Sequence, residues 1–225
     1  DAGLRILQEE VPQYAAYDML DEHRLSALLS REYGNLGMDD LCDHGHWKTI
    51  KHFIANANVV ENELVPVDKI GDHKFADVYP AYLDMLSRYR VFTFGQLITR
   101  VVEALHDKQV FKRVHGRLRH LIVDEYQDVN PAQEKLVELL SASPVQVCVV
   151  GDDDQAIYQW RGSSVSNFIN FENKYGAHRI DLRENRRSMP RIIERANVFA
   201  ASILPRIPKT MNPVRIGKGP QFHPW

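Results

Sequence analysis

Cysteine is scarce in this sequence, and no long apolar run is present. The 225 residues include two cysteines, Cys42 and Cys148, too few for the disulfide framework of a small secreted domain. No apolar run reaches the roughly 20 residues that a membrane-spanning helix needs, and no signal-peptide pattern occurs. We therefore predict a cytoplasmic protein with no membrane partner. Because Cys148 lies in the apolar run VQVCVV, we expect its thiol to be buried.

A strong excess of charge of either sign is also absent. The formal net charge is −2, which excludes a polycation whose whole surface attracts nucleic acid. Any contact with nucleic acid must therefore come from a local patch. Hydrophobic residues make up 44% of the chain and charged residues 26%, a composition typical of a globular protein with one or two domains.

The chain has no initiator methionine, and no helix cap precedes its first residues. The segment DAGLRILQEE already has helical spacing, with Leu4, Leu7 and then Val11. This predicts that the sequence begins inside an element and is a fragment of a longer protein.

Helical spacing continues to about residue 112. Four apolar stripes recur at intervals of three and four residues, which is typical of amphipathic helices. They comprise Leu25, Leu28, Leu29 and Tyr33; Trp47, Ile50, Phe53, Ile54 and Ala57; Tyr79, Tyr82, Leu83, Leu86 and Tyr89; and Phe94, Leu97, Ile98, Val101, Val102 and Leu105. Pro66 and Gly71 predict a loop over residues 61–78. Residues 1–112 are thus expected to form an all-helical subdomain.

The pattern changes to strand, helix and strand after Arg117. LIV at 121–123 is short and β-branched, which predicts a strand buried on both faces. Asn130-Pro131 is typical of a helix start, and VQVCVV at 145–150 predicts a second strand. The spacing indicates a βαβ unit with two parallel strands. The fold class predicted is α/β, with a parallel sheet and a separate helical subdomain.

Further elements are expected towards the end of the chain. A helix is predicted from about Ser164 to Tyr175, ending at Gly176, followed by a strand over residues 179–182. Ser188 and Pro190 indicate the start of another helix. The segment after Pro205 is rich in proline and is expected to be irregular.

Acidic residues follow both strands of the βαβ unit. Asp124-Glu125 comes after the first strand, and Asp152-Asp153-Asp154 comes after the second. In open α/β sheets, ligands bind beyond the carboxyl ends of the strands, so the two clusters should face one crevice. One carboxylate can hold Mg²⁺ beside phosphates while the next activates water, as in nucleotide hydrolysis. The simpler alternative is that these acids are solvated strand ends.

A group of aromatic and polar residues follows the second acidic cluster. Gln155 is followed by Tyr158, Trp160 and Arg161. Aromatic faces stack on bases and a cation pairs with phosphate, which is how proteins bind single-stranded nucleic acid. The alternative is that both aromatic side chains pack in the core.

Three motifs together resemble the UvrD/Rep family of superfamily 1 DNA helicases. They are DEYQD at 124–128, GDDDQAIYQWRGS at 151–163 and LRENRRS at 182–188. HGRLRHLIVDE, which runs into the first motif, and the preceding FTFGQLI resemble the join between a helical subdomain and the first motor domain of that family. The resemblance implies a RecA-like motor fold. It assigns residues 1–112 to a 1B-like helical subdomain, 113–178 to the C-terminal half of the first motor domain, and 179–225 to the start of the second.

The resemblance also implies roles for single residues. Asp124 would bind Mg²⁺, Glu125 would be the base that activates water, and Gln155 would sense the γ-phosphate of ATP. Arg187 would be the arginine finger from the second motor domain. Tyr158, Trp160 and Arg161 would couple the nucleotide site to a DNA strand. The implied protein uses Mg·ATP hydrolysis to move along single-stranded DNA and to unwind a duplex at a junction.

This sequence departs from the family pattern at three points. Arg186 stands where the family has a tyrosine that stacks on adenine, although a guanidinium plane can also stack on a base. Ala156 replaces a serine. The phosphate loop GxxxxGK[ST] is absent, since the only Gly-Lys pair is Gly217-Lys218 and neither flank fits. We therefore predict that this chain by itself neither hydrolyses ATP nor unwinds DNA.

Two other functions fit parts of the sequence. Asp124, Glu125, Asp128 and Asp152 would form a two-metal site in a Mg²⁺-dependent nuclease. A non-catalytic module that binds DNA or protein through the helical subdomain is the other alternative.

Two local patterns also raise possible binding sites. Cys42, His44, His46 and His52 resemble zinc ligands, but their spacing is unusual for a closed site, which favours ordinary loop residues. The run 106–120 carries Lys108, Lys112, Arg113, Arg117 and Arg119. These cations would meet DNA phosphate or, more simply, form a helix face in water.

Overall fold

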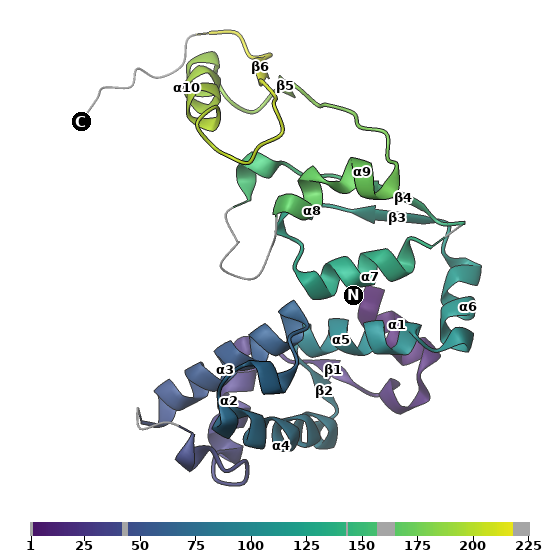
Figure 1. Ribbon diagram of the computed structural model, residues 1–225, viewed down its shortest axis with the longest axis vertical. Coiled ribbons are helices and arrows are strands. Elements are labelled where there is room, and N and C mark those ends of the chain that lie inside the picture. The colour runs from purple at the N-terminus through teal and green to yellow at the C-terminus, as the bar shows by residue number, and fades with distance from the viewer. Residues whose placement is uncertain (1, 42–44, 143, 157–164, 218–225) are drawn as a thin grey trace.

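The computed structural model describes residues 2–41, 45–142, 144–156 and 165–217. Figure 1 shows an elongated molecule with helices at one end, the β3–β4 pair in the middle, and β5, β6 and α10 at the other end. No helix in these ranges is long and apolar enough to cross a membrane.

One hydrophobic core lies among α2 (Glu22–Glu32), α3 (His46–Glu63) and α4 (His73–Tyr89). Asp21 and Asp72 accept hydrogen bonds from backbone N–H groups in the first turns of α2 and α4, which satisfies donors that have no partner within the helix. The expected loop at 61–78 is shorter than predicted, because α3 extends to Glu63 and α4 begins at His73. Trp47, expected in an apolar stripe, is 63% exposed in the first turn of α3.

A second core joins α1 (Ala2–Glu10), α5 (Phe94–Leu105) and α6 (Lys108–Arg117). A short parallel pair, β1 (Asp18–Met19) and β2 (Val91–Phe92), connects the two cores. Phe94, expected in the stripe of α5, is 70% exposed at the first position of the helix. Arg113 and Arg117 bind Glu10 of α1, so the basic face of α6 is not simply solvated.

A buried carboxylate ties α3 to α5. Glu61 accepts hydrogen bonds from the Thr93 hydroxyl at 2.9 Å, the Gln96 amide at 3.0 Å and the Tyr82 hydroxyl at 3.3 Å. Gly95 passes close by, since a Cβ there would lie 2.5 Å from Glu61 Oε2. Burial raises the pKa of Glu61, although the three hydrogen bonds oppose that shift. The FTFGQLI segment thus surrounds one buried acid.

The predicted βαβ unit is confirmed. It consists of β3 (His120–Val123), α7 (Pro131–Leu140) and β4 (Gln146–Val149), and its two strands are parallel. Asn130 caps α7 in a reciprocal arrangement with Gln133, with Pro131 at the first helical position. We call this βαβ unit, together with α8 (Val165–Ile169) and α9 (Phe171–Tyr175), the first unit.

Only one face of the β3–β4 pair is covered by the described residues. Leu121, Val123, Val147 and Val149 pack with Tyr126, α7 and α9. The prediction that the first strand is buried on both faces is wrong, because Ile122 is 72% exposed. The prediction of a buried Cys148 thiol is wrong for the same reason, since Cys148 points to the uncovered face.

The helix expected at 164–175 is divided into α8 and α9 at Asn170. Gly176 ends α9 in the left-handed conformation (φ 61°), as predicted. Short 3₁₀ turns complete the described chain at Pro12–Tyr14, Met38–Asp40, Val67–Lys69, Tyr126–Asp128 (η4) and Asp153–Gln155 (η5).

A second βαβ arrangement follows, which we call the second unit. It consists of β5 (Glu184–Asn185), α10 (Pro190–Ala200) and β6 (Asn212–Pro213), with its strands parallel. The strand predicted at 179–182 is wrong, because Ile180 and Leu182 are exposed and the strand begins only at Glu184. The tail is more ordered than expected, since the Asn197 side chain exchanges two 3.0 Å hydrogen bonds with the Met211 backbone.

Candidate functional site

The two acidic segments lie at one edge of the β3–β4 pair. Val150 N donates to Val123 O at 2.8 Å, and Tyr126 N donates to Val150 O at 3.0 Å. These bonds extend the parallel pairing beyond the strands and align Asp124-Glu125 with the segment that leads to Asp152. The predicted juxtaposition at a shared carboxyl edge is therefore confirmed.

Asp124 and Glu125 are both exposed at this edge. Asp124 Oδ1 accepts a hydrogen bond from Glu125 N at 2.9 Å. Glu125 has φ 50° and ψ 43°, in the left-handed region that non-glycine residues rarely adopt. Leu64 and Arg90, with similar φ values, each end a helix, whereas Glu125 connects a strand to η4. Unusual backbone conformations of this kind cluster at functional sites.

Gln127 joins the two acidic segments. Its side-chain amide donates to Glu125 Oε2 at 2.8 Å, and its Oε1 accepts from Asp152 N at 3.0 Å. The Gln127 side chain is almost fully buried. One glutamine therefore orients the Glu125 carboxylate and fixes the loop after β4, a role that our sequence reasoning missed.

Gly151 makes this bridge possible. A Cβ at this position would lie 2.6 Å from Gln127 Oε1 and 3.1 Å from Phe168 Cε2. No side chain fits there without displacing Gln127. A glycine directly after a predicted strand was the available signal that another group approaches the backbone closely.

Tyr126 anchors the Asp124–Asp128 loop to the helices beneath it. Its fully buried hydroxyl donates to Glu134 Oε2 on α7, while Lys174 of α9 donates to Glu134 Oε1 at 2.6 Å. Burial, and then the Glu134 carboxylate, raise the pKa of the Tyr126 hydroxyl. The loop therefore has a rigid base, although the carboxylates of Asp124 and Glu125 are open to solvent.

Asp152 and Gln155 form a pair within the second acidic segment. Gln155 Nε2 donates to Asp152 Oδ2 at 2.7 Å, and Lys209 lies 2.9 Å from Asp152 Oδ1. Burial alone would raise the pKa of Asp152, but the bonds from Gln155 and Lys209 together lower it. Lys209 and its neighbour Arg206 come from the predicted irregular tail, and sequence patterns did not indicate their role.

Asp128 differs from its acidic neighbours. Its Oδ1 is buried and has no hydrogen-bond partner among the described residues. Burial, and then the charge of Glu125, raise its pKa.

The donor set at this edge fits one Mg²⁺ ion held beside a phosphate. Magnesium is usually bound by one or two carboxylates, with waters and phosphate oxygens completing the shell, and Asp124 offers an exposed carboxylate of that kind. Within the described ranges, no three His, Cys, Asp or Glu side chains gather closely enough to hold a metal. Asp124, Glu125, Asp128 and Asp152, the residues of the two-metal nuclease alternative, are therefore not gathered into such a group.

Arg186 and Arg187, which were also predicted at the nucleotide site, make their contacts within the second unit instead. Arg186 is exposed and pairs with Glu184 at 2.6 Å. Arg187 is also exposed, and its backbone N–H donates to the Asn185 side chain at 3.1 Å. Tyr158, Trp160 and Arg161 lie outside the described residues.

Two of the four residues in the zinc alternative, His46 and His52, are among the described residues. Cys42 and His44 lie outside the described residues. His46 pairs with the Ser30 hydroxyl at 2.8 Å, and His52 pairs with Asp72 at 3.0 Å. Both described histidines thus have ordinary protein partners.

Comparison with known proteins gives a family and several relatives. The family described as the UvrD/REP helicase N-terminal domain matches residues 3–176. An ATP-dependent DNA helicase PcrA of Leuconostoc citreum is 34% identical over 214 residues, which cover 92% of this chain and 28% of the relative. PcrA of Staphylococcus aureus is 38% identical over 166 residues (70% and 23%), and DNA helicase II of Haemophilus influenzae is 33% identical over 151 residues (67% and 21%). The chain spans about a quarter of the length of these relatives.

Proposed function

The chain belongs to the UvrD/REP helicase family, and we propose that it supplies part of the ATP-driven motor of a DNA helicase. One observation carries the proposal: β3 and β4 bring two acidic segments to one sheet edge, where Gln127 joins them. Nucleotides bind at such edges in open α/β folds. The names of the relatives, which include ATP-dependent DNA helicases, support the same substrate class.

We assign a RecA-like architecture to the two βαβ arrangements. In this proposal, residues 1–112 form the 1B-like helical subdomain, residues 113–178 belong to the first motor domain, and residues 179–225 begin the second. Parallel strands linked by helices in both units support this division. The cytoplasmic location stays a prediction.

In the proposed site, Asp124 binds Mg²⁺ and Glu125 is the base. Mg·ATP, when bound, supplies the metal-bridged phosphates whose hydrolysis drives such motors. Gln127 holds one oxygen of the Glu125 carboxylate, so the other oxygen is left to orient a water molecule and take its proton. The rigid Tyr126–Glu134 base keeps the loop in place.

Three further residues have proposed roles at the nucleotide. Gln155 senses the γ-phosphate, and the Asp152 bond that now holds its amide is the natural competitor for that contact. Arg187 is the arginine finger, and its exposure on the second unit leaves it available to reach a phosphate. Arg186 stacks on adenine in place of a tyrosine, which requires it to leave Glu184.

DNA contact is assigned to Tyr158, Trp160 and Arg161, which lie three to six residues after Gln155 in sequence. The proposed substrate is single-stranded DNA next to a duplex junction. Fluorescence anisotropy with a labelled single strand tests this assignment. Trp160→Ala should weaken binding, whereas equal and negligible binding by both chains would remove DNA from this site.

ATP turnover tests the catalytic assignment. Because the sequence has no GxxxxGK[ST] motif, the 225-residue chain alone should show no hydrolysis. In a polypeptide that joins this chain to such a loop, single-stranded DNA should stimulate hydrolysis. Glu125→Gln should then lower the rate by roughly 10²–10⁴-fold, the usual contribution of a general base. Unchanged turnover in Glu125→Gln would contradict the assignment, and turnover by the 225-residue chain would contradict the need for the loop.

A further inference from the structure

The three aspartates after β4 bind a segment about fifty residues further along the chain. Arg206 donates to both oxygens of Asp154, at 2.6 and 2.9 Å. Lys209 contacts the carboxylates of Asp152, Asp153 and Asp154, and Ile207 N donates to Asp153 Oδ2 at 2.6 Å. We call these six residues, 152–154 with Arg206, Ile207 and Lys209, the clasp.

The clasp is more than a pair of solvated surface charges. The Asp153 side chain is 1% exposed, and those of Arg206 and Asp154 are 12% and 14% exposed. Burial alone would lower the pKa of Lys209, but its bonds to Asp153 and Asp152 and their charges raise it. Charge-assisted hydrogen bonds in partly buried settings contribute more than exposed ion pairs do.

In the part of the chain that the structure describes, the clasp is also the principal link between the two units, apart from the chain itself. Among the described residues, β5, α10 and β6 pack mainly against one another. The connecting segment 177–183 is exposed along most of its length. Figure 1 shows this segment as an extended stretch of irregular chain between α9 and β5. The position of the second unit therefore depends on Arg206 and Lys209.

Asp152 connects the clasp to the proposed catalytic groups. Its side chain lies between Lys209 on one oxygen and the Gln155 amide on the other. Its backbone N–H donates to Gln127, which in turn holds Glu125. Displacement of Lys209 would therefore change the environment of Gln155 through a single carboxylate.

Charge is divided unevenly between the two sides of the clasp. Residues 179–225 contain ten Lys and Arg against three Asp and Glu, whereas residues 1–178 contain 18 against 27. The two parts attract each other, and this attraction is screened over about 10 Å at 0.1 M salt. Clasp closure should accordingly weaken at high ionic strength.

We propose that Arg206 and Lys209 are positioning residues that couple the second unit to Gln155 through Asp152. With the clasp closed, the Gln155 amide is held on Asp152. With it open, the amide is released and the second unit moves on its linker. The coupling to hydrolysis rests on the proposed role of Gln155, whereas the clasp itself is testable without nucleotide.

The test uses ¹⁵N-labelled 225-residue chain in solution. The side-chain NH₂ signals of Gln155, identified by their loss in Gln155→Glu, should shift in Lys209→Met. Hydrogen exchange at Ile207 N–H should become at least about tenfold faster, because Asp153 Oδ1 loses Lys209 and the carboxylate is no longer fixed against Ile207 N. A tenfold change is a loss of roughly 1.4 kcal/mol of protection. Relaxation of second-unit amides should report motion independent of the first unit. Lys209→Arg, which keeps the charge, should restore the Gln155 signals.

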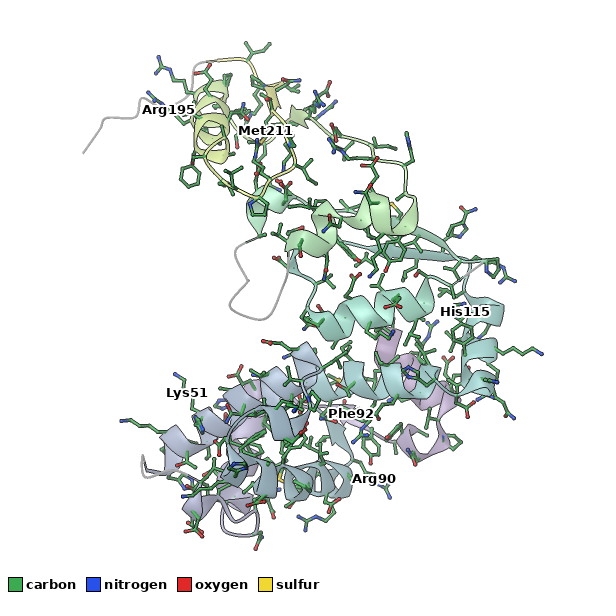
Figure 2. All side chains as sticks on the ribbon, viewed as in Figure 1. Lys51, Arg90, Phe92, His115, Arg195 and Met211 are labelled. Carbon is green, nitrogen blue, oxygen red and sulfur yellow. The ribbon has the colours of Figure 1, made fainter. Side chains whose placement is uncertain are left out.

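Arg195→Gln is the matched control, since it removes one positive charge from α10 at an exposed position outside the clasp (Figure 2). The proposal is overturned if Lys209→Met and Arg195→Gln give the same Gln155 signals. If Lys209→Met unfolds the second unit, the test uses a double variant, Asp154→Arg with Arg206→Asp, in which the two charges of this ion pair are exchanged. Recovery of Ile207 protection in that double variant, relative to either single change, supports the clasp, and no recovery contradicts it. No arm requires ATP, so failure of the nucleotide site would leave these results distinct.

Discussion

Gln127 accepts a hydrogen bond from Asp152 N at 3.0 Å and donates one to Glu125 Oε2 at 2.8 Å, so one side chain links the ends of two parallel strands. The link explains why the acidic loops have a defined geometry although their carboxylates face solvent. Because of this link, a movement of the loop after β4 would also change the orientation of the Glu125 carboxylate, the proposed base.

Gln127→Leu should destabilise the fold and release the loop after β4. The substitution leaves Asp152 N–H without its acceptor, which costs about 1–3 kcal/mol of unfolding free energy. Urea denaturation measures this loss. Gln109→Leu, at an exposed position on α6, is the control and should change stability little. A Gln127→Leu chain as stable as the control would mean that the bridge contributes nothing.

Gly151→Ala should have a similar effect by a different route. The added methyl group would lie 2.6 Å from Gln127 Oε1, so either the glutamine or the strand end must move. We expect a loss of about 1–3 kcal/mol, as for overpacked sites. Gly116→Ala in α6 is the matched control, because a Cβ added there would meet no neighbouring group within 4 Å. Alanine there should stabilise the helix by about 0.5–1 kcal/mol. Equal effects at both glycines would rule out a special role for Gly151.

Glu61 should make stability depend on pH. Its pKa is raised in the folded chain, so between the ordinary carboxyl value and the folded value the native state binds more protons than the unfolded state. Stability should therefore fall as pH rises through that window and become level above it. Glu61→Gln should remove this slope, and unfolding free energies across pH 4–8 measure it.

Glu63→Gln, at an exposed position two residues along α3, is the comparison for that series and should keep the slope. A slope that persists in Glu61→Gln would assign the effect to another group. Glu61→Ala should be strongly destabilising at every pH, because the Thr93, Tyr82 and Gln96 donors would lose their shared acceptor.

Local patterns predicted the elements of the first unit well. Asn130-Pro131 indicates a helix start through a cap and a missing N–H, and both depend only on neighbouring residues. The β-branched runs predicted the strands and their parallel order. Which face of a strand is buried depends on what packs there, and so Ile122 and Cys148 were predicted wrongly.

Contacts distant in sequence were not predictable in the same way. Arg206 lies 52 residues from Asp154, and no periodicity connects them. The tail was expected to be irregular from its prolines, which describe the local backbone but not its ion pairs. Gln127 lies in the motif DEYQD, whose three acidic residues are typical of a solvated loop. Its burial was therefore not predicted. Only Gly151 marked the close approach that buries it.

The central claim is that the Asp124 loop and the Asp152 loop form one divalent-cation and nucleotide site. Mn²⁺, which replaces Mg²⁺ and broadens nearby amide signals, tests this directly in the ¹⁵N-labelled chain. We predict that amides of residues 124–127 and 151–155 broaden together, and that Asp124→Asn abolishes both effects. Broadening of only one segment, or broadening that survives Asp124→Asn, would contradict the claim.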